Sequence, residues 1–332
     1  MANKGLAEKA LAILQAKSEK ALKNAKELIL KEKFRCEKAN EALQYYVATW
    51  NDTTHPGVLA LAHEAVGGKA EEAVPLQTAM LFIDAAMDIH DDIIDKSTVK
   101  GSKETLYGKF GEETALIIGN ALLVKGFNYL YKVSEKLPLE KKQLLVDTVK
   151  NFLFEVIDAH LKEVELRNRK WNTKPKEYLN VLKMKAADIE GHMRIGAIFG
   201  GGSAQEIKAL TRYGRCLGIL LLTRSDFIDL FEQDELTNRV KYECLPLPVL
   251  YALKNHTFRN KVYRILSKKE IEENGINELI EIIYGMPEIF IVRRYLKFLE
   301  KRAIVSIINL QMKNKDIENT LSLLAKSMLE DL

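Results

Sequence analysis

Cysteine is scarce in this chain, and long apolar runs are absent. The 332 residues include three cysteines, Cys36, Cys216 and Cys244, which lie too far apart in sequence to suggest a disulfide framework or a metal knuckle. So few, unclustered cysteines fit a reducing compartment, and we expect a cytoplasmic protein. No apolar run approaches the length of about 18 residues that a membrane-spanning helix needs, so we expect no transmembrane segment.

Charge of one sign is not in excess either. The 50 Lys and Arg residues stand against 46 Asp and Glu residues, which leaves a formal net charge of +4. Because the charges are interspersed, this balance argues against a nucleic-acid partner. Apolar residues make up 47% of the chain, which is enough for a large buried core and excludes global disorder.

The seven prolines leave two long stretches of the chain without any. Residues 76–137 and 176–245 are rich in Ala, Leu, Ile, Lys and Glu, which favour helices. Apolar residues recur at three- and four-residue spacing, and sustained period-two alternation is rare, so a sheet is not expected. We predict a single-domain, all-α bundle of roughly ten or more helices over residues 1–332, with an amphipathic N-terminal helix over residues 1–33.

Residues 81–95 form the most informative segment, because aspartates are set there among strongly apolar residues. At about 100° per residue, these aspartates share one face of a helix. Like charges four residues apart destabilise a helix, so we expect a cation to offset them; the alternative is a solvated acidic face. Carboxylate oxygens suit Mg²⁺, which also binds substrate phosphates. The aspartates are Asp84, Asp88, Asp91, Asp92 and Asp95.

A second acidic pair lies in the apolar stretch 218–229. Asp226 and Asp229 are three residues apart and therefore share a helix face. Such a pair taken alone usually lies on a surface, but together with the first stripe it suggests two carboxylate clusters that clamp a diphosphate through Mg²⁺. Glu163 and Glu165, by contrast, are expected on the surface.

The run HDDIIDKS at residues 90–97 resembles the first aspartate-rich motif, DDxxD, of the trans-isoprenyl diphosphate synthase family. The similarity extends in order over roughly residues 40–260, and Asp226–Asp229 lie where the second motif belongs. The resemblance implies the all-helical isoprenoid synthase fold. It also implies a Mg²⁺-dependent prenyltransferase of isoprenoid biosynthesis, which condenses an allylic prenyl diphosphate with isopentenyl diphosphate.

The resemblance further assigns roles to individual residues. The expected Mg²⁺ ligands are Asp91, Asp92, Asp95, Asp226 and Asp229. Lys100 and Lys185 are expected to contact the allylic diphosphate as catalytic residues. His55, at a position where the family has an arginine, and Lys103 are expected to help bind substrate.

The prenyl tail and the assembly follow from the same resemblance. A tail that runs along the helix preceding the first motif would meet Phe82, Ala86 and Met87, which we expect to set the chain length. The family also implies a homodimer, or a heteromer with a second prenyl synthase subunit.

Several family positions differ in this sequence. The family's GGKRxRP run, which binds the second diphosphate, aligns with Asn51–Pro56, so that its lysine becomes Asp52 and its second arginine becomes His55. The second motif carries Ser225 in place of its first aspartate. The loss of cations leaves two alternatives open. One is a terpene cyclase or diphosphate lyase, and the other is a non-catalytic regulatory or structural subunit of a prenyl diphosphate synthase.

Overall fold

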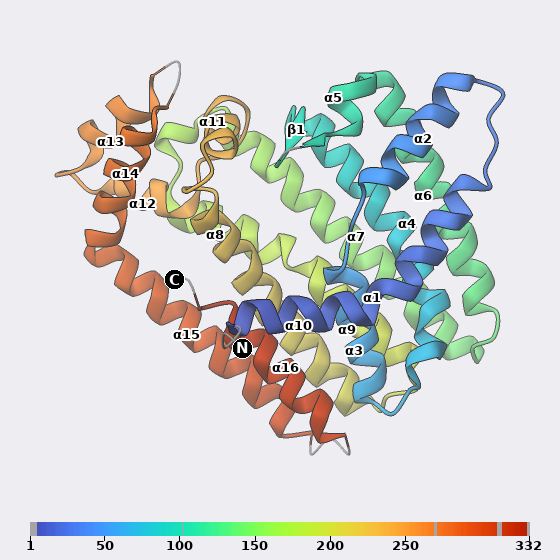
Figure 1. Ribbon diagram of the computed structural model, residues 1–332. Coiled ribbons are helices and arrows are strands. Elements are labelled where there is room, and N and C mark those ends of the chain that lie inside the picture. Colours follow the sequence, from blue (N-terminus) through green and yellow to red (C-terminus); the bar gives the residue numbers. More distant parts are fainter. Residues whose placement is uncertain (1–4, 102, 269–270, 311–313, 331–332) are drawn as a thin grey trace. The chain divides into compact units, whose positions relative to one another are not determined.

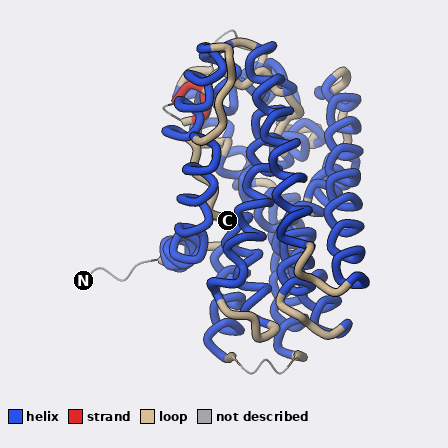
Figure 2. Tube along the Cα trace, turned by 90° about the vertical axis from the view of Figure 1, so that its right-hand side faces the viewer, coloured by secondary structure: helices blue, strands red, loops and turns tan. Residues whose placement is uncertain are grey.

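The computed structural model describes residues 5–101, 103–268, 271–310 and 314–330, and within these ranges the chain is almost entirely helical (Figure 1 and Figure 2). The predicted all-α fold is therefore confirmed. The α-helices are α1 (Leu6–Leu30), α2 (Glu37–Thr49), α3 (Thr54–Ala65), α4 (Ala70–Ile94), α5 (Leu106–Phe110), α6 (Glu112–Ser134), α7 (Leu139–Arg167), α8 (Pro175–Lys185), α9 (Ala187–Phe199), α10 (Ala204–Ile228), α11 (Gln233–Tyr242), α12 (Leu247–Lys254), α13 (Arg259–Leu266), α14 (Glu273–Gly285), α15 (Pro287–Ile308) and α16 (Lys315–Ser327).

Two short strands and one 3-10 turn complete the described secondary structure. Strands β1 (Val99–Lys100) and β2 (Lys103–Glu104) pair antiparallel, with Lys100 opposite Lys103. The 3-10 turn covers Lys170–Asn172. The N-terminal helix predicted over residues 1–33 is observed as α1, while residues 1–4 lie outside the described residues. None of the described helices combines the length and apolar character needed to cross a membrane.

The chain is organised as two compact units, each built from several segments. The first unit comprises Met1–Val149, His192–Leu210 and Leu310–Thr320, and the second comprises Lys150–Gly191, Thr211–Asn309 and Leu321–Leu332. The single domain expected from the sequence stays a prediction.

In the first unit, α4 packs along α6, and α1 packs against α3 and α4 (Figure 1). Helix α4 is buried on most sides because apolar residues surround its axis; Phe82 and Ala86 are fully buried in the core. Gly126 of α6 allows the close approach of the two helices, since a Cβ atom there would lie 2.6 Å from Cγ1 of Ile83. This packing fixes the position of the acidic end of α4.

In the second unit, α12 packs against α8, α13, α14 and α15. Arg215 of α10 forms a bidentate pair with Glu155 of α7, with nitrogen–oxygen distances of 2.7 and 2.9 Å. Arg215 also pairs with Glu190 of α9. Tyr213 is fully buried, and its hydroxyl donates to the carbonyl of Leu321 at 2.7 Å. These contacts join helices that lie far apart in sequence.

Candidate functional site

The first acidic cluster lies where α4 ends. Asp91 and Asp92 occupy the last turn of the helix, and Asp95 follows as its C-cap. Asp92 is 5% exposed and Asp95 is 8% exposed. The chain turns sharply at Lys96, whose φ of 54° lies in the left-handed region. Because a helix C-terminus already carries partial negative charge, carboxylates gathered there favour a bound cation.

Lys100 brings a positive charge of the chain to this cluster. Its Nζ lies 2.6 Å from Oδ1 of Asp92 and 2.9 Å from Oδ1 of Asp88. Burial raises the pKa of Asp92 to about 7, although the attraction of Lys100 acts in the opposite direction. Burial also disfavours the charged form of Lys100, but Asp88 and Asp92 outweigh it and raise the lysine pKa. Lys100 therefore pairs with two carboxylates of α4 at once.

The loop that carries Lys100 is held in place by backbone contacts. The hydroxyl of Thr105 donates to the carbonyl of Ser97 at 2.6 Å, and its N–H donates to the carbonyl of Thr98 at 3.0 Å. The backbone of Gly108 approaches the Thr98 carbonyl so closely that any Cβ atom would displace the loop. Lys100 therefore lies in a hairpin whose base is held by backbone contacts, opposite the exposed Lys103.

The second acidic pair lies at the end of α10 and is turned into the interior. Asp226 is 2% exposed and Asp229 is 9% exposed, whereas the neighbouring Ser225 is exposed. Nη1 of Arg239, from α11, lies 2.9 Å from Oδ1 of Asp226 and also binds Asp229. Burial raises the pKa of Asp226 to about 6, and Arg239 acts in the opposite direction. Nη2 of Arg239 donates to the hydroxyl of Tyr178 at 2.6 Å.

Lys185, at the end of α8, forms an ion pair with Glu163 of α7. Glu163 is only 3% exposed, so the expectation that it lies on the surface is wrong, whereas Glu165 is exposed as expected. The physical reason is that Lys185 supplies the positive charge that allows a carboxylate to be buried. Burial raises the pKa of the neighbouring Cys244 thiol to about 12, and that thiol donates to the Glu163 carbonyl at 3.4 Å.

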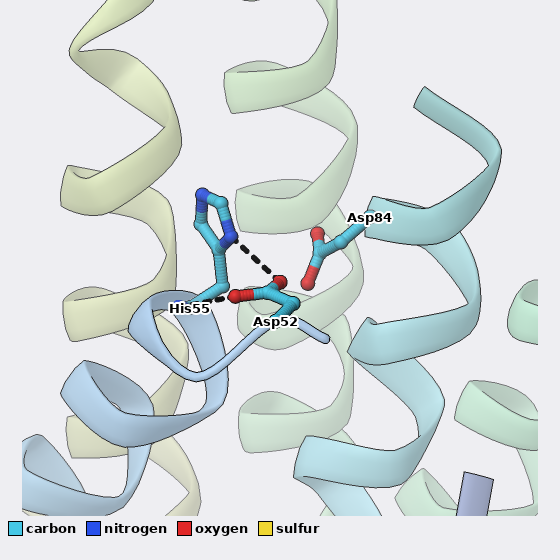
Figure 3. A group of neighbouring side chains, drawn as sticks. All are labelled: Asp52, His55 and Asp84. Atoms are coloured by element: carbon cyan, nitrogen blue, oxygen red, sulfur yellow. Dashed lines mark hydrogen bonds and ion pairs between the residues drawn. The ribbon is translucent and has the colours of Figure 1, made fainter. Parts of the chain in front are cut away.

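The third group, which we call the Asp–His cluster, consists of Asp52, His55, Asp84 and His192. Figure 3 shows the carboxylates of Asp52 and Asp84 turned toward one another beside His55. Nδ1 of His55 lies 2.8 Å from Oδ2 of Asp52, and Nε2 of His192 lies 3.1 Å from Oδ2 of Asp84. The ligating atoms of Asp52, His55 and Asp84 lie within 4.8 Å of one another, a geometry compatible with a metal ion.

Electrostatics within the Asp–His cluster favour negative charge on Asp52. Burial disfavours its ionised form, but the nearby His55 outweighs burial and lowers the pKa of Asp52. The other carboxylate oxygen of Asp52 accepts the N–H groups of Thr54 and His55 at 3.0 and 3.3 Å, at the start of α3. Asp52 thus accepts hydrogen bonds from the first turn of this helix as well as contributing charge.

The residues expected to set chain length lie on α4 in the first unit. Phe82 and Ala86 have no exposed surface, and Met87 is partly buried. The ring of Phe82 meets the ring of Tyr129 edge to face, with centroids 5.9 Å apart. A role in chain length stays a prediction.

Arg239 and His192 are the site residues that sequence reasoning missed. Each is separated from its carboxylate partner by a change of helix, so no helical spacing connects them. Arg239 follows Asp226 by a turn and most of α11, and His192 lies in α9 while Asp84 lies in α4. The sequence signal for Arg239 is its position as a single arginine just before the apolar segment that follows α11.

Comparisons with known proteins place this chain among prenyl synthases. A family model described as "Polyprenyl synthetase" matches residues 36–283. The geranylgeranyl diphosphate synthase of Methanosarcina mazei is 29% identical over 208 residues, which cover 62% of this chain and 63% of that protein. A short chain isoprenyl diphosphate synthase of Methanothermobacter thermautotrophicus is 27% identical over 261 residues, which cover 74% and 77%. The match thus spans less than two thirds of the first relative.

Solved structures share the fold. The geranylgeranyl pyrophosphate synthetase of Pyrococcus horikoshii matches with a TM-score of 0.83 and 22% identity, over 98% of this chain and 99% of that one. A polyprenyl synthase of Caulobacter crescentus, described as complexed with calcium and isoprenyl diphosphate, matches with a TM-score of 0.79 and 17% identity, over 96% and 97%. These likenesses confirm the predicted all-helical isoprenoid synthase fold.

Proposed function

Because this chain belongs to the polyprenyl synthetase family, we propose that it is a Mg²⁺-dependent prenyltransferase. Its substrates would be an allylic prenyl diphosphate and isopentenyl diphosphate. The observation that carries the proposal is the cluster of Asp91, Asp92 and Asp95 at the end of α4, with Lys100 held beside it. The relatives from Methanosarcina mazei and Methanothermobacter thermautotrophicus carry names with the same reaction class.

The first cluster fits Mg²⁺ by its donor set. Its ligands would be carboxylate oxygens, which this hard cation prefers, and three carboxylates lie close together at this end of α4. When bound, Mg²⁺ would neutralise charge on the departing diphosphate. Lys100 would add a positive charge beside the same carboxylates, and a charge that is already in place needs little reorganisation during the reaction.

The other expected site residues would also take part in this reaction. Lys185 would contact the allylic diphosphate from α8, with Glu163 orienting its ammonium. Lys103 and His55 would contribute to substrate binding, and Phe82, Ala86 and Met87 would line the path of the prenyl tail. Cytoplasmic location, expected from the scarcity of cysteine, stays a prediction.

The Asp–His cluster favours a second candidate, in which the allylic diphosphate ionises without condensation. Asp52 and His55 stand where the family has a lysine and an arginine for the second diphosphate, and Asp84 adds another carboxylate beside them. Two carboxylates repel a diphosphate, so isopentenyl diphosphate would bind weakly there. A terpene cyclase or diphosphate lyase does not require that second site.

An apolar face of α6 supports self-association. Ile117, Val124 and Tyr131 are seven residues apart along one face and are 62%, 70% and 57% exposed. Phe127 extends the same face, and a patch of this kind on a helix commonly marks a protein interface. We propose a homodimer through α6. A heteromer is the alternative, since one Arabidopsis thaliana relative is named as the large subunit of a heterodimeric synthase.

Ultracentrifugation tests this assembly. The variant Val124→Glu places a charge in the apolar face, and we expect it to sediment as a monomer while the wild-type chain sediments as a dimer. The matched control is Lys132→Ala, at an exposed polar position on the same helix, which should stay dimeric. An unchanged mass for Val124→Glu would contradict an interface at this face.

Turnover of the purified chain tests the function. The chain is incubated with Mg²⁺ and an allylic diphosphate, with and without isopentenyl diphosphate. Elongated product supports the condensation, and release of pyrophosphate without isopentenyl diphosphate supports the second candidate. Activity that appears only after addition of a second prenyl synthase subunit supports the heteromer. Asp95→Asn should abolish turnover, and activity that persists in this variant would contradict the metal site at α4.

A further inference from the structure

Arg239 occupies the place between the two carboxylates of the second acidic pair. Its Nη1 contacts both Asp226 and Asp229, and its Nη2 donates to the Tyr178 hydroxyl, which in turn donates to Asp226 at 3.2 Å. Its Nε donates to the carbonyl of Cys244 at 3.2 Å. All three guanidinium nitrogens therefore have acceptors.

The acceptor capacity of Asp226 is also largely used. Its Oδ1 receives Arg239 and Tyr178, and its Oδ2 accepts the N–H of Leu247 at 2.9 Å. Leu247 is the first residue of α12, so this carboxylate also stabilises a helix N-terminus. A metal ion would have to displace contacts that hold the chain between α11 and α12.

Burial and charge also disfavour a metal ion at the second acidic pair. Arg239 is 7% exposed, and both aspartates are buried beside it. Mg²⁺ keeps several of its water ligands when it binds a protein. The space between these two buried carboxylates is filled by the guanidinium group, which leaves little room for such waters. A divalent cation would also lie next to a buried positive charge. Ser225, which stands where a family ligand is expected, is exposed and brings no carboxylate to the pair.

We propose that Arg239 is the permanent counter-ion of Asp226 and Asp229, so that this pair holds no metal and serves to fix the start of α12. The metal expected at this pair from the sequence does not fit the residues as they are arranged. The inference rests on the proposed function in one respect only, which is that metal binds at Asp91, Asp92 and Asp95. The second acidic pair then stabilises the fold, and the catalytic metal binds at the end of α4.

Manganese binding separates the two possibilities. The number of Mn²⁺ ions bound by the full chain is counted from the electron paramagnetic resonance signal of free Mn²⁺, with and without inorganic pyrophosphate. We expect Asp229→Asn to bind as many Mn²⁺ ions as the wild-type chain, and Asp95→Asn to bind fewer. Loss of one ion in a folded Asp229→Asn variant would overturn the proposal.

Thermal unfolding provides a measurement that does not depend on the first cluster. We expect Arg239→Gln to lower the melting temperature by roughly 5 °C or more, because two buried carboxylates lose their counter-ion. Asp158→Asn, which alters an exposed carboxylate on α7, is the control and should leave the melting temperature unchanged. A melting temperature of Arg239→Gln equal to that of the wild-type chain would overturn the role of Arg239.

The two measurements fail independently. If the wild-type chain binds no Mn²⁺ even with pyrophosphate, the proposed function is contradicted, while the unfolding data still decide the role of Arg239. If Asp229→Asn does not fold, Arg239→Gln decides the metal question. Added Mn²⁺ should then raise the melting temperature of Arg239→Gln by more than it raises that of the wild-type chain, because only in the variant can a divalent cation replace the missing counter-ion at the second acidic pair. An equal rise in the two chains would overturn the counter-ion role.

Discussion

The ammonium of Lys100 lies 2.6 Å from the buried carboxylate of Asp92, at the end of the helix that carries the first aspartate motif. This pair places a cation of the chain next to a proposed Mg²⁺ ligand. Lys100 therefore has two opposite effects at the site. It competes electrostatically with a metal ion, and it attracts the diphosphate that the metal ion would bring.

Replacing Lys100 should separate these two effects. We expect Lys100→Met to bind Mg²⁺ alone about fivefold more tightly, because roughly 1 kcal/mol of repulsion between cations is removed at this half-exposed position. The same variant should bind inorganic pyrophosphate with Mg²⁺ more weakly. Calorimetric titration measures both affinities.

Lys103 provides the matched control for Lys100. It lies opposite Lys100 in the hairpin and is exposed. Lys103→Met should leave Mg²⁺ affinity unchanged. Weaker Mg²⁺ binding by Lys100→Met would contradict the view that this lysine competes with the metal.

Glu243 should make stability depend on pH. Burial raises the pKa of Glu243 to about 7 in the folded chain, although Arg239 acts in the opposite direction. Its stabilising contribution is therefore complete below the ordinary value of 4.5 and is lost as the pH rises through about 7. Glu243→Gln resembles the protonated form at every pH. Its free energy of unfolding at pH near 8 should therefore be on the order of 2 kcal/mol larger than that of wild type.

Urea unfolding at a series of pH values checks this expectation. The difference between Glu243→Gln and wild type should nearly vanish at pH of about 4.5 and grow toward pH of about 8. Glu165→Gln, at an exposed position, should show no such growth. A Glu243→Gln variant that is less stable than wild type at the higher pH would refute the assignment.

The first acidic cluster could be predicted because its information is local. Asp91, Asp92 and Asp95 lie within one turn of each other, so helical geometry alone brings them together. The burial of the apolar residues of α4 is present in the structure. The short hairpin at Val99–Glu104 was not predicted, because two-residue strands carry no alternation to detect.

The second acidic pair shows why the rest could not be predicted. Its spacing is as regular as that of the first cluster, but its counter-ion comes from α11, after a change of chain direction. Helical spacing contains no information about such a contact. The same reason accounts for Glu163, which has the sequence context of a surface residue and is buried by its partner Lys185.

Gly126 should be required for the close packing of α6 on α4. Gly126→Ala places a Cβ atom 2.6 Å from Cγ1 of Ile83 and 3.2 Å from Cβ of Phe82, neither of which is the flexible end of a side chain. We expect a loss of about 1–3 kcal/mol in the free energy of unfolding, in spite of the better helix propensity of alanine. Gly285→Ala, where nothing lies within 4 Å of the new Cβ atom, is the control and should be neutral or slightly stabilising. Equal stability of the two variants would argue against tight packing at Gly126.

Asp52 should oppose anion binding at the Asp–His cluster. Asp52→Asn keeps an oxygen that can accept the N–H of Thr54, so the start of α3 is preserved while the negative charge is removed. We expect the variant to bind inorganic pyrophosphate about fivefold more tightly than wild type, the effect of removing roughly 1 kcal/mol of repulsion.

Asp52→Asn should lower the stability of the folded chain, although it should strengthen the binding of pyrophosphate. Because His55 lowers the pKa of Asp52, the ionised carboxylate stabilises the folded chain above its ordinary value of 3.8, and this contribution is lost as the pH falls through the lowered pKa. Asp52→Asn should therefore be less stable than wild type at neutral pH.

Calorimetric titration with pyrophosphate, with and without Mg²⁺, measures the effect of Asp52→Asn on anion binding. If Asp52→Asn binds pyrophosphate more weakly and only when Mg²⁺ is present, then Asp52 holds a bridging cation, and the cluster assists the binding of a diphosphate that its charge alone would repel.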